Sequence, residues 1–444
     1  MAYWSLNRQN QNLFLLVSSF IFYGFVTPWI CLLLASSIIV DFFCGKAIYV
    51  DRSNNKKYLF ISIAFNLTLL AVFKYFNFFI ESITRFFALF DMHPSLTVLN
   101  IALPVGISFY TFQTLSYTID IYRGKLKPTS DFISFAVFVS FFPQLVAGPI
   151  ERASNMLPQI LSDRDIDGSD IRSGIYLIMR GFVKKLVVAD NIAVYVDKIF
   201  LLEQAGVLMV AVGSIGFGLQ IYADFSAYTD IARGTAKLLG IRLMENFRSP
   251  YFAWSPSEFW RRWHISLSTW IRDYLYIPLG GSRAKSRARL LMILIITMAL
   301  SGLWHGADWH FVAWGIYHGF LLVIYHSIGF TGNTAPANRL GHLAAVGIMF
   351  VLTVVGWSLF RTPDLGWLYS SVQGTQATLS DNINNAVYLI ALFIFYALPL
   401  GFYKFPLHKI KLDSLWILLC ILLPLVVIVI FHRDSANAFI YFQF

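Results

Sequence analysis

Long apolar stretches separated by short polar connections make up most of the chain. A helix needs about 20 residues to cross the hydrocarbon of a bilayer, with about 17–25 tolerated. Some of the stretches are shorter, so we expect tilted, broken or re-entrant helices among them. A backbone that breaks inside a membrane must be buried in protein or line a cavity. The pattern therefore predicts an all-α polytopic membrane protein, with its main apolar stretches at residues 58–80, 133–146, 207–221, 290–303, 311–328, 343–360, 386–402 and 415–431.

Three stretches are helical in pattern but too polar to face lipid. Residues 169–200 carry Arg180, Lys184, Lys185 and Asp190, so this helix should line the interior or lie at a surface. Residues 224–239 and 103–122 also mix apolar and polar side chains. The pattern of residues 103–122 is that of a helix that lines a cavity.

Composition supports the membrane interpretation. The chain has 444 residues, 57% of them hydrophobic and 13% charged, whereas soluble domains carry about 25% charged residues. Lys and Arg gather in short loops between apolar segments, as the positive-inside rule describes, so the net charge of +10 does not indicate nucleic-acid binding. No repeat or long hydrophilic stretch interrupts the pattern, which predicts one membrane domain over residues 1–444. The three cysteines lack CxxC spacing, so we expect neither a disulfide framework nor a zinc site.

Basic loops set the expected orientation of the second half. Basic residues at 283–289 and 404–411 each precede an apolar segment, so both loops should be cytoplasmic. Four apolar segments lie between them, and an even number agrees with both assignments. The segment at 415–431 then crosses outward, which predicts that residues 432–444 end on the extracytoplasmic side.

Two short stretches, 255–280 and 301–308, hold unusually many functional groups for a membrane chain. His305 follows the basic loop by about 15 residues, which places it roughly 22 Å into the membrane. Imidazole titrates near neutrality, and burial keeps it neutral and able to accept a proton. An intramembrane ionisable residue is a functional hypothesis by default. The alternative is a helix-packing histidine, and Gly302 and Gly306 would allow close approach in either case.

Several other residues are candidates for the site, and most of them also fit a structural role. His264, among Trp260, Trp263 and two arginines, fits a catalytic role or an interfacial anchor. His310, His318 and His326 recur every eight residues, which is not metal-ligand spacing, so we predict no metal site. Trp304 and Asp308 are candidates for shaping the site around His305. Arg180, Lys184 and Lys185 could bind the phosphates of a nucleotide-like donor such as coenzyme A, or could snorkel from an interfacial helix.

An ordered set of motifs gives the chain a family resemblance. Residues 260–264 (WRRWH), 272–274 (RDY) and 302–306 (GLWHG) resemble the membrane-bound O-acyltransferase (MBOAT) family. Residues 103–113, 119–124 and 141–149 are similar to the branch of alginate and peptidoglycan O-acetyltransferases, related to the Dlt D-alanyl transferase. The resemblance covers most of the chain from about residue 12.

This resemblance implies a fold and an activity. The fold would be roughly a dozen transmembrane and re-entrant helices around a central funnel, with His305 as catalytic base, His264 as second histidine and Gly306 in the motif. An acyl donor, expected to be acetyl-CoA, would enter from the cytoplasm. The acetyl group would go to a cell-envelope polysaccharide such as peptidoglycan or alginate. The setting would be a bacterial inner membrane, with an extracytoplasmic SGNH-type partner that supplies a serine nucleophile.

The last six residues, 439–444, form an aromatic tail of sequence FIYFQF. The tail is too short to span a membrane and resembles the C-terminal peptide of the small companion protein in the Dlt pathway. We expect it either to fold back into the funnel, with the Tyr441 hydroxyl as an acyl relay, or to anchor in the interface.

Two other functions fit the same pattern. A Dlt-like enzyme would take a D-alanyl or other acyl group from a carrier-protein thioester. A transporter of a lipid-linked sugar would use the same polar cavity without making bonds.

Overall fold

The computed structural model describes residues 2–92, 94, 97–99, 103–330, 335–374, 379–402, 410, 413–433 and 438–440. Within these ranges the chain is helix and loop, without a β-strand. Seven helices of the described chain are long and apolar enough to cross a membrane. The structure thus confirms an all-α, multi-pass membrane protein. The chain folds as two compact units, residues 1–167 with 236–244 and residues 168–235 with 245–444.

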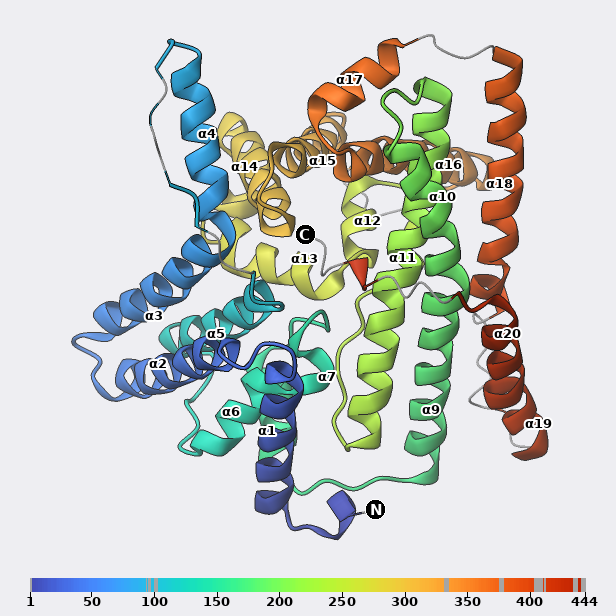
Figure 1. Ribbon diagram of the computed structural model, residues 1–444. Helices are drawn as coiled ribbons and strands as arrows, with labels where there is room; N and C mark the ends of the chain where they lie inside the picture. Colours follow the sequence, from blue (N-terminus) through green and yellow to red (C-terminus); the bar gives the residue numbers. More distant parts are fainter. Residues whose placement is uncertain are drawn as a thin grey trace. The chain divides into compact units, whose positions relative to one another are not determined.

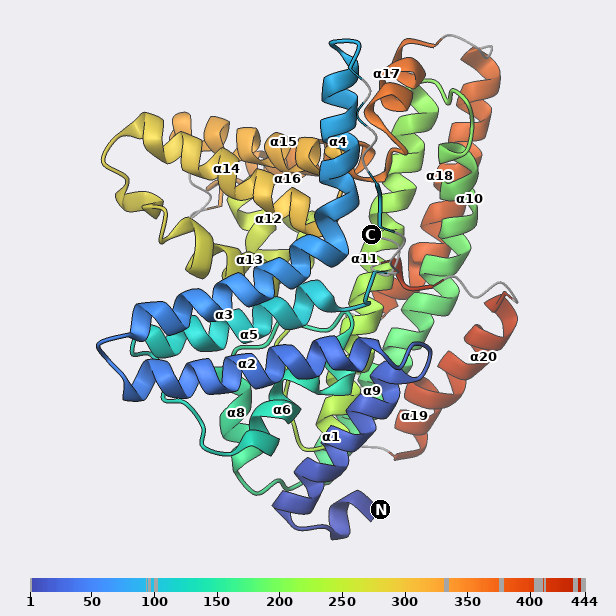
Figure 2. The same ribbon diagram turned by 60° about the vertical axis from the view of Figure 1, so that its left-hand side comes forward.

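The first unit holds the N-terminal helices. Helices α2, α3 and α5 pack side by side (Figure 2). Their shared interior is polar: the Asp41 carboxylate, on α2, accepts hydrogen bonds from Ser62 (2.6 Å) and Asn66 (2.8 Å) on α3. A fully buried carboxylate must be satisfied inside the protein, and here the neighbouring helix supplies the donors. The helices are α1 (Arg8–Gly24), α2 (Ile30–Val50), α3 (Asn55–Leu70), α4 (Phe76–Ala88), α5 (Ile107–Tyr122), α6 (Phe132–Ser140), α7 (Phe142–Leu145) and α8 (Ala153–Leu161).

The second unit begins with two long helical segments that lie side by side (Figure 1). The first is α9 (Gly168–Phe182), a π-helical segment η3 (Val183–Ala189) and α10 (Asp190–Phe200); the second is α11 (Val207–Leu238). Glycines set their separation. A Cβ on Gly181 would lie 2.8 Å from the Ala227 carbonyl oxygen, and one on Gly234 would lie 2.6 Å from that of Gly174. Small residues are the usual means of close helix packing in membranes.

The rest of the second unit surrounds a core of aromatic side chains. Trp263, Trp314 and Trp357 are its largest fully buried members, and Trp263 packs against Trp357 with ring centroids 4.9 Å apart. The apolar stretches expected after residue 290 all form helices here. The elements are α12 (Pro256–Arg262), α13 (Ile265–Ile271), α14 (Arg287–His305), α15 (Trp309–Ser327), α16 (Arg339–Arg361), α17 (Leu365–Gln373), α18 (Leu379–Phe402), α19 (Asp413–Ile417) and α20 (Leu423–Phe431).

Candidate active site

His305 is the last residue of α14, and its side chain is buried among aromatic rings. The residue is 4% exposed. Its ring centroid lies 5.1 Å from Trp304, 5.2 Å from Trp314 and 5.5 Å from Phe360. The carboxyl end of a helix carries partial negative charge, which stabilises a nearby cation. His305 thus lies at the negative end of α14, where aromatic rings enclose its side chain.

Glycines on either side of His305 are sterically required. A Cβ on Gly302 would lie 2.1 Å from the Phe311 carbonyl oxygen, and one on Gly306 would lie 2.0 Å from the Phe311 ring. On the facing helix, a Cβ on Gly315 would lie 2.2 Å from the Met298 carbonyl oxygen. Helices α14 and α15 thus cross with almost touching backbones, and this crossing fixes where His305 points.

His264 lies in the turn between α12 and α13. Its φ of 44° is in the left-handed region, and its side chain is fully buried. Asn246 holds the following residues: the Ile265 N–H donates to its main-chain carbonyl (3.0 Å) and the Ser266 N–H donates to its side-chain oxygen (3.2 Å). A strained backbone conformation persists only where the surroundings determine it, and such residues cluster at functional sites.

The two histidines meet in the interior of this unit. Their ring centroids are 6.2 Å apart, and the Trp304 ring lies 5.9 Å from that of His264. On its other side, His264 packs edge-on against Phe225 of α11 at 4.7 Å. Burial, and secondarily the nearby His305, lower the pKa of His264 well below its usual value, so this ring is neutral near pH 7.

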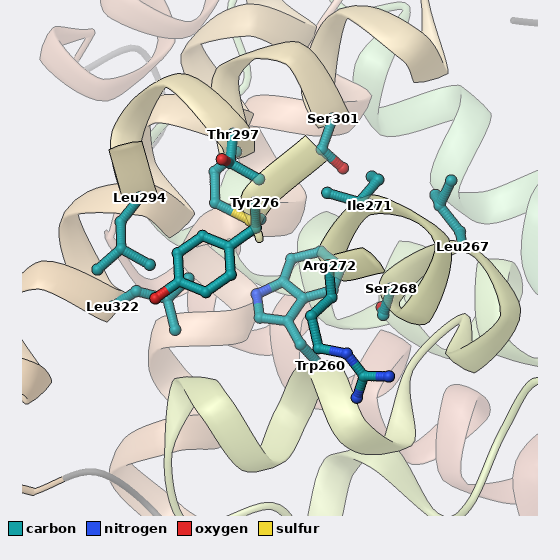
Figure 3. Close-up of a pocket in the computed structure, with 11 residues that line it drawn as sticks. Trp260, Leu267, Ser268, Ile271, Arg272, Tyr276, Leu294, Thr297, Ser301 and Leu322 are labelled. Carbon is teal, nitrogen blue, oxygen red and sulfur yellow. The ribbon is translucent and has the colours of Figure 1, made fainter. Parts of the chain in front are cut away.

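A small cavity of about 150 Å³ lies beside α14 (Figure 3). Ser301 and Thr297 face it, one and two helical turns before His305, so the row along this face of α14 leads to the histidine. Its wall is mostly apolar, and Arg272 supplies the charge. The lining residues are Trp260, Leu267, Ser268, Ile271, Arg272, Tyr276, Leu294, Thr297, Met298, Ser301 and Leu322.

A larger cavity of about 620 Å³ contains two of the predicted donor-binding residues. Arg180 and Lys184 both bind the Asp230 carboxylate, Lys184 at 2.6 Å. Four basic side chains line the cavity against two carboxylates, so its wall is net positive. The charged residues are Arg180, Lys184, Asp230, Arg233, Glu245 and Arg248. We call this space the basic cavity.

Lys185, the third predicted donor-binding residue, lies elsewhere. Its ammonium pairs with Asp190 (2.9 Å) and Asp224 (2.8 Å) and lines a separate, small cavity that also includes Ala438 and Ile440. The three basic residues therefore do not form one cluster. Tyr441, the predicted relay, lies outside the described residues.

Asp308 and His310, at the start of α15, make local contacts. The Asp308 side chain is exposed and caps α15 by accepting a hydrogen bond from the His310 N–H (3.1 Å). The Nδ1 atom of His310 lies 3.3 Å from the carbonyl oxygen of Leu359. Among the residues that the structure describes, no three His, Cys, Asp or Glu side chains converge on a possible metal position.

Sequence reasoning missed several residues of this site. Asp230 binds Arg180 and Lys184 from 50 and 46 residues away along the chain. Asn246 holds the two residues that follow His264, and Trp314 packs against the His305 ring. Asp224 and Asp230 carried the one usable signal, because carboxylates within a membrane segment require partners. Trp314 gave none, since an aromatic residue in an apolar stretch is ordinary.

Comparison with known proteins gives a consistent result. The model of the membrane-bound O-acyltransferase family matches residues 17–347. A probable alginate O-acetylase of Pseudomonas aeruginosa is 40% identical over 82% of this chain and 69% of its own length. A peptidoglycan O-acetyltransferase of Helicobacter pylori is 34% identical over 82% of this chain and 74% of its own. A teichoic acid D-alanyltransferase of Streptococcus thermophilus is 32% identical over 50% and 56%.

Proposed function

The chain belongs to the membrane-bound O-acyltransferase family, and from that premise we propose that it passes an acetyl group from cytoplasmic acetyl-CoA across the membrane for O-acetylation of a cell-envelope polysaccharide. The relatives named for alginate and peptidoglycan acetylation support acetyl as the group and an envelope polymer as the destination. A bacterial inner membrane is the corresponding location.

The observation that carries the proposal is the pairing of His305 with His264 at the end of α14. A general base must be held within reach of the proton that it accepts, with a pKa near the working pH. His305 is the last residue of its helix, surrounded by three aromatic rings, and its glycine neighbours leave no freedom to shift. His264 is neutral and adjacent, so it can donate or accept a hydrogen bond without adding a competing charge.

In the proposed reaction His305 takes the proton of the accepting hydroxyl as its oxygen attacks the thioester carbonyl carbon. The carbon–oxygen bond forms, the carbon–sulfur bond breaks, and the proton passes from His305 to the departing sulfur. The products are an acetyl ester and coenzyme A, and the imidazole returns to its neutral state. Polar neighbours steady the oxyanion of the tetrahedral intermediate. Trp304 and Gly306 shape this site, and Asp308 acts through the start of α15.

The basic cavity is the proposed donor site. Coenzyme A carries several phosphates, which Arg and Lys bind by charge-assisted hydrogen bonds. The cavity has a suitable volume for a cofactor-sized ligand, typically about 300–1,000 Å³. Its wall reaches the histidines through Phe247, which packs against both Trp263 (5.0 Å) and Phe225 (5.0 Å).

The accepting hydroxyl is proposed to be that of Tyr441, which then passes the acetyl group to a serine of an SGNH-type partner outside the cell membrane. A covalent relay divides one difficult transfer into two easier ones. Support comes from the residues just before Tyr441: Ala438 and Ile440 bind inside the second unit, beside α11.

The test uses purified full-length chain in vesicles with radiolabelled acetyl-CoA. We expect His305→Ala to abolish labelling of the C-terminal peptide and of the acceptor. A matched variant, His326→Ala, changes an exposed histidine of the same region and should keep the parental rate. Labelling that survives in His305→Ala would refute the role of His305 as the general base.

Two further arms separate the alternatives. A Tyr441→Phe chain that acetylated the acceptor at full rate would eliminate the relay. A chain that used only a carrier-protein thioester, and not acetyl-CoA, would favour D-alanyl or similar transfer. Transport of a lipid-linked sugar would persist in His305→Ala, because it requires no base.

A further inference from the structure

We propose that Lys185, Asp190 and Asp224, hereafter the tail cage, form a binding site that holds the chain's own C-terminal segment by its backbone on both sides of Phe439. Binding in the tail cage stands on the contacts below. Its consequence for acyl transfer rests on the function proposed above.

All three N–H donors of the Lys185 ammonium have an acceptor only when the tail is bound. A lysine has three N–H donors, and Lys185 has three partners: Asp190 Oδ1 at 2.9 Å, Asp224 Oδ1 at 2.8 Å and the Ala438 carbonyl oxygen at 3.3 Å. The Lys185 side chain is 9% exposed. Because a buried donor without an acceptor is costly, the third partner completes the site.

The carboxylates of the tail cage can also accept a hydrogen bond from the tail. One ammonium faces two buried carboxylates, so the tail cage has an excess of acceptors. The second oxygen of Asp224 accepts the hydrogen bond of the Ile440 N–H. The Ile440 side chain is buried in the large aromatic and aliphatic core of this unit. The tail therefore supplies an N–H to the anionic side and a carbonyl to the cationic side.

The residue between these two main-chain contacts is held by its ring. The Lys185 ammonium lies 4.7 Å from the centroid of the Phe439 ring. The Tyr228 ring packs edge-on against it, 5.1 Å away with the planes at 86°. A cation over an aromatic face is attractive, more so away from water. The combination fixes the register of the tail, because a shift by one residue would remove the Phe439 ring from both Lys185 and Tyr228.

Two further contacts direct the tail to this place. The Arg433 side chain donates to Asn191 (2.9 Å), and the Asn191 amide donates to the Phe431 carbonyl (3.1 Å), both next to the start of α10. Gln220 lies one turn before Asp224 and lines the same small cavity. Its amide oxygen is buried without a hydrogen-bond partner among the described residues.

This assignment separates Lys185 from the donor site. Asp224 and Asp230 are six residues apart on α11, about 9 Å along its axis and about 120° apart around it. Lys184 binds the second and Lys185 binds the first. Consecutive lysines thus serve two different sites. Phe225, the residue after Asp224, packs against His264.

The experiment measures tail seating without measuring transfer. Purified full-length protein in detergent is digested with a carboxypeptidase, and the shortened C-termini are followed by mass spectrometry. For the parent we expect digestion to stall at or before Ile440, because residues 438–440 are held. Lys185→Met, Asp224→Leu and Phe439→Ala should each let digestion proceed past residue 439 at least tenfold faster, relative to the same variant unfolded in SDS. Lys198→Met, an exposed lysine of α10, should stall as the parent does.

The outcomes distinguish the tail cage from the proposed function. If the parent and all three variants are digested past residue 439 at the same rate, the tail cage is wrong whatever the transfer activity. If the three variants release the tail but acetylate at the parental rate, the tail cage stands and the relay through the tail is wrong. Phe439→Ala lies on the tail itself, so it remains informative should either substitution in the tail cage prevent folding.

Discussion

Replacing Gly302 with alanine tests how tightly the α14–α15 crossing holds His305. The new Cβ would lie 2.1 Å from the Phe311 carbonyl oxygen and 3.1 Å from the Gly315 nitrogen, where ordinary contact begins at 3.4 Å. Both are main-chain atoms and cannot rotate away, so the two helices must part by about 1 Å.

Such a separation affects both stability and rate. Overpacking of this kind costs about 1–3 kcal/mol. His305 lies one turn beyond Gly302, and Trp314 flanks its ring from the opposite helix. A displacement of about 1 Å in a catalytic group can lower the rate on the order of 100-fold. We therefore expect Gly302→Ala to remain inserted but to lose most of its transfer rate.

The assay is acetyl transfer in vesicles, with the melting temperature measured in detergent. Gly347→Ala provides the matched control, because Gly347 lies within α16 and a Cβ there would meet nothing within 4 Å. That variant should keep the parental rate and gain slightly in stability, since alanine is favoured over glycine in a helix by up to about 1 kcal/mol. Parental rate and melting temperature in Gly302→Ala would refute the account of the crossing.

Two other predictions concern the charged and titratable groups. Lys184→Met should raise the KM for acetyl-CoA on the order of 10-fold and leave kcat near the parental value, because it removes one charged contact from the basic cavity. An unchanged KM, or an equal increase in the exposed control Lys198→Met, would contradict a role of Lys184 in donor binding. The pKa of His264 is lowered in the folded state by burial and by His305, so below about pH 6.5 the unfolded chain binds more protons and stability falls as the pH drops. His264→Gln should therefore flatten the loss of melting temperature between pH 7 and pH 5, and an unaltered slope would argue against a neutral, buried His264.

The sequence predicted the helices well, because apolar length alone determines which segments can lie in a bilayer. The polar stretch 169–200 is helical as expected, and the second-half segments all form helices. The stretches 207–221 and 224–239 are one continuous helix, α11. The sequence divides this helix because its second half carries Asp224 and Asp230. Both carboxylates pair with buried lysines, and a hydropathy pattern does not distinguish a buried, paired carboxylate from an exposed one.

The site was predictable only where a residue type itself implied chemistry. His264 and His305 were singled out as rare ionisable groups, and the structure brings them together. The grouping of Lys185 with Arg180 and Lys184 followed sequence proximity, whereas their partners depend on which face of the helix each occupies. Asn246 was not predictable, since its role is to hold a turn after residue 264 that exists only in the folded chain.

The π-helical segment η3 links two sites that the chemistry keeps apart. It contains Lys184 and Lys185, and a π turn accommodates one more residue than an α turn. Rewinding that turn would rotate both ammonium groups away from Asp230 and Asp224 together. By this movement the proposed donor site and the proposed tail cage would lose their lysine contacts together, so we expect deletion of one residue within η3 to weaken both.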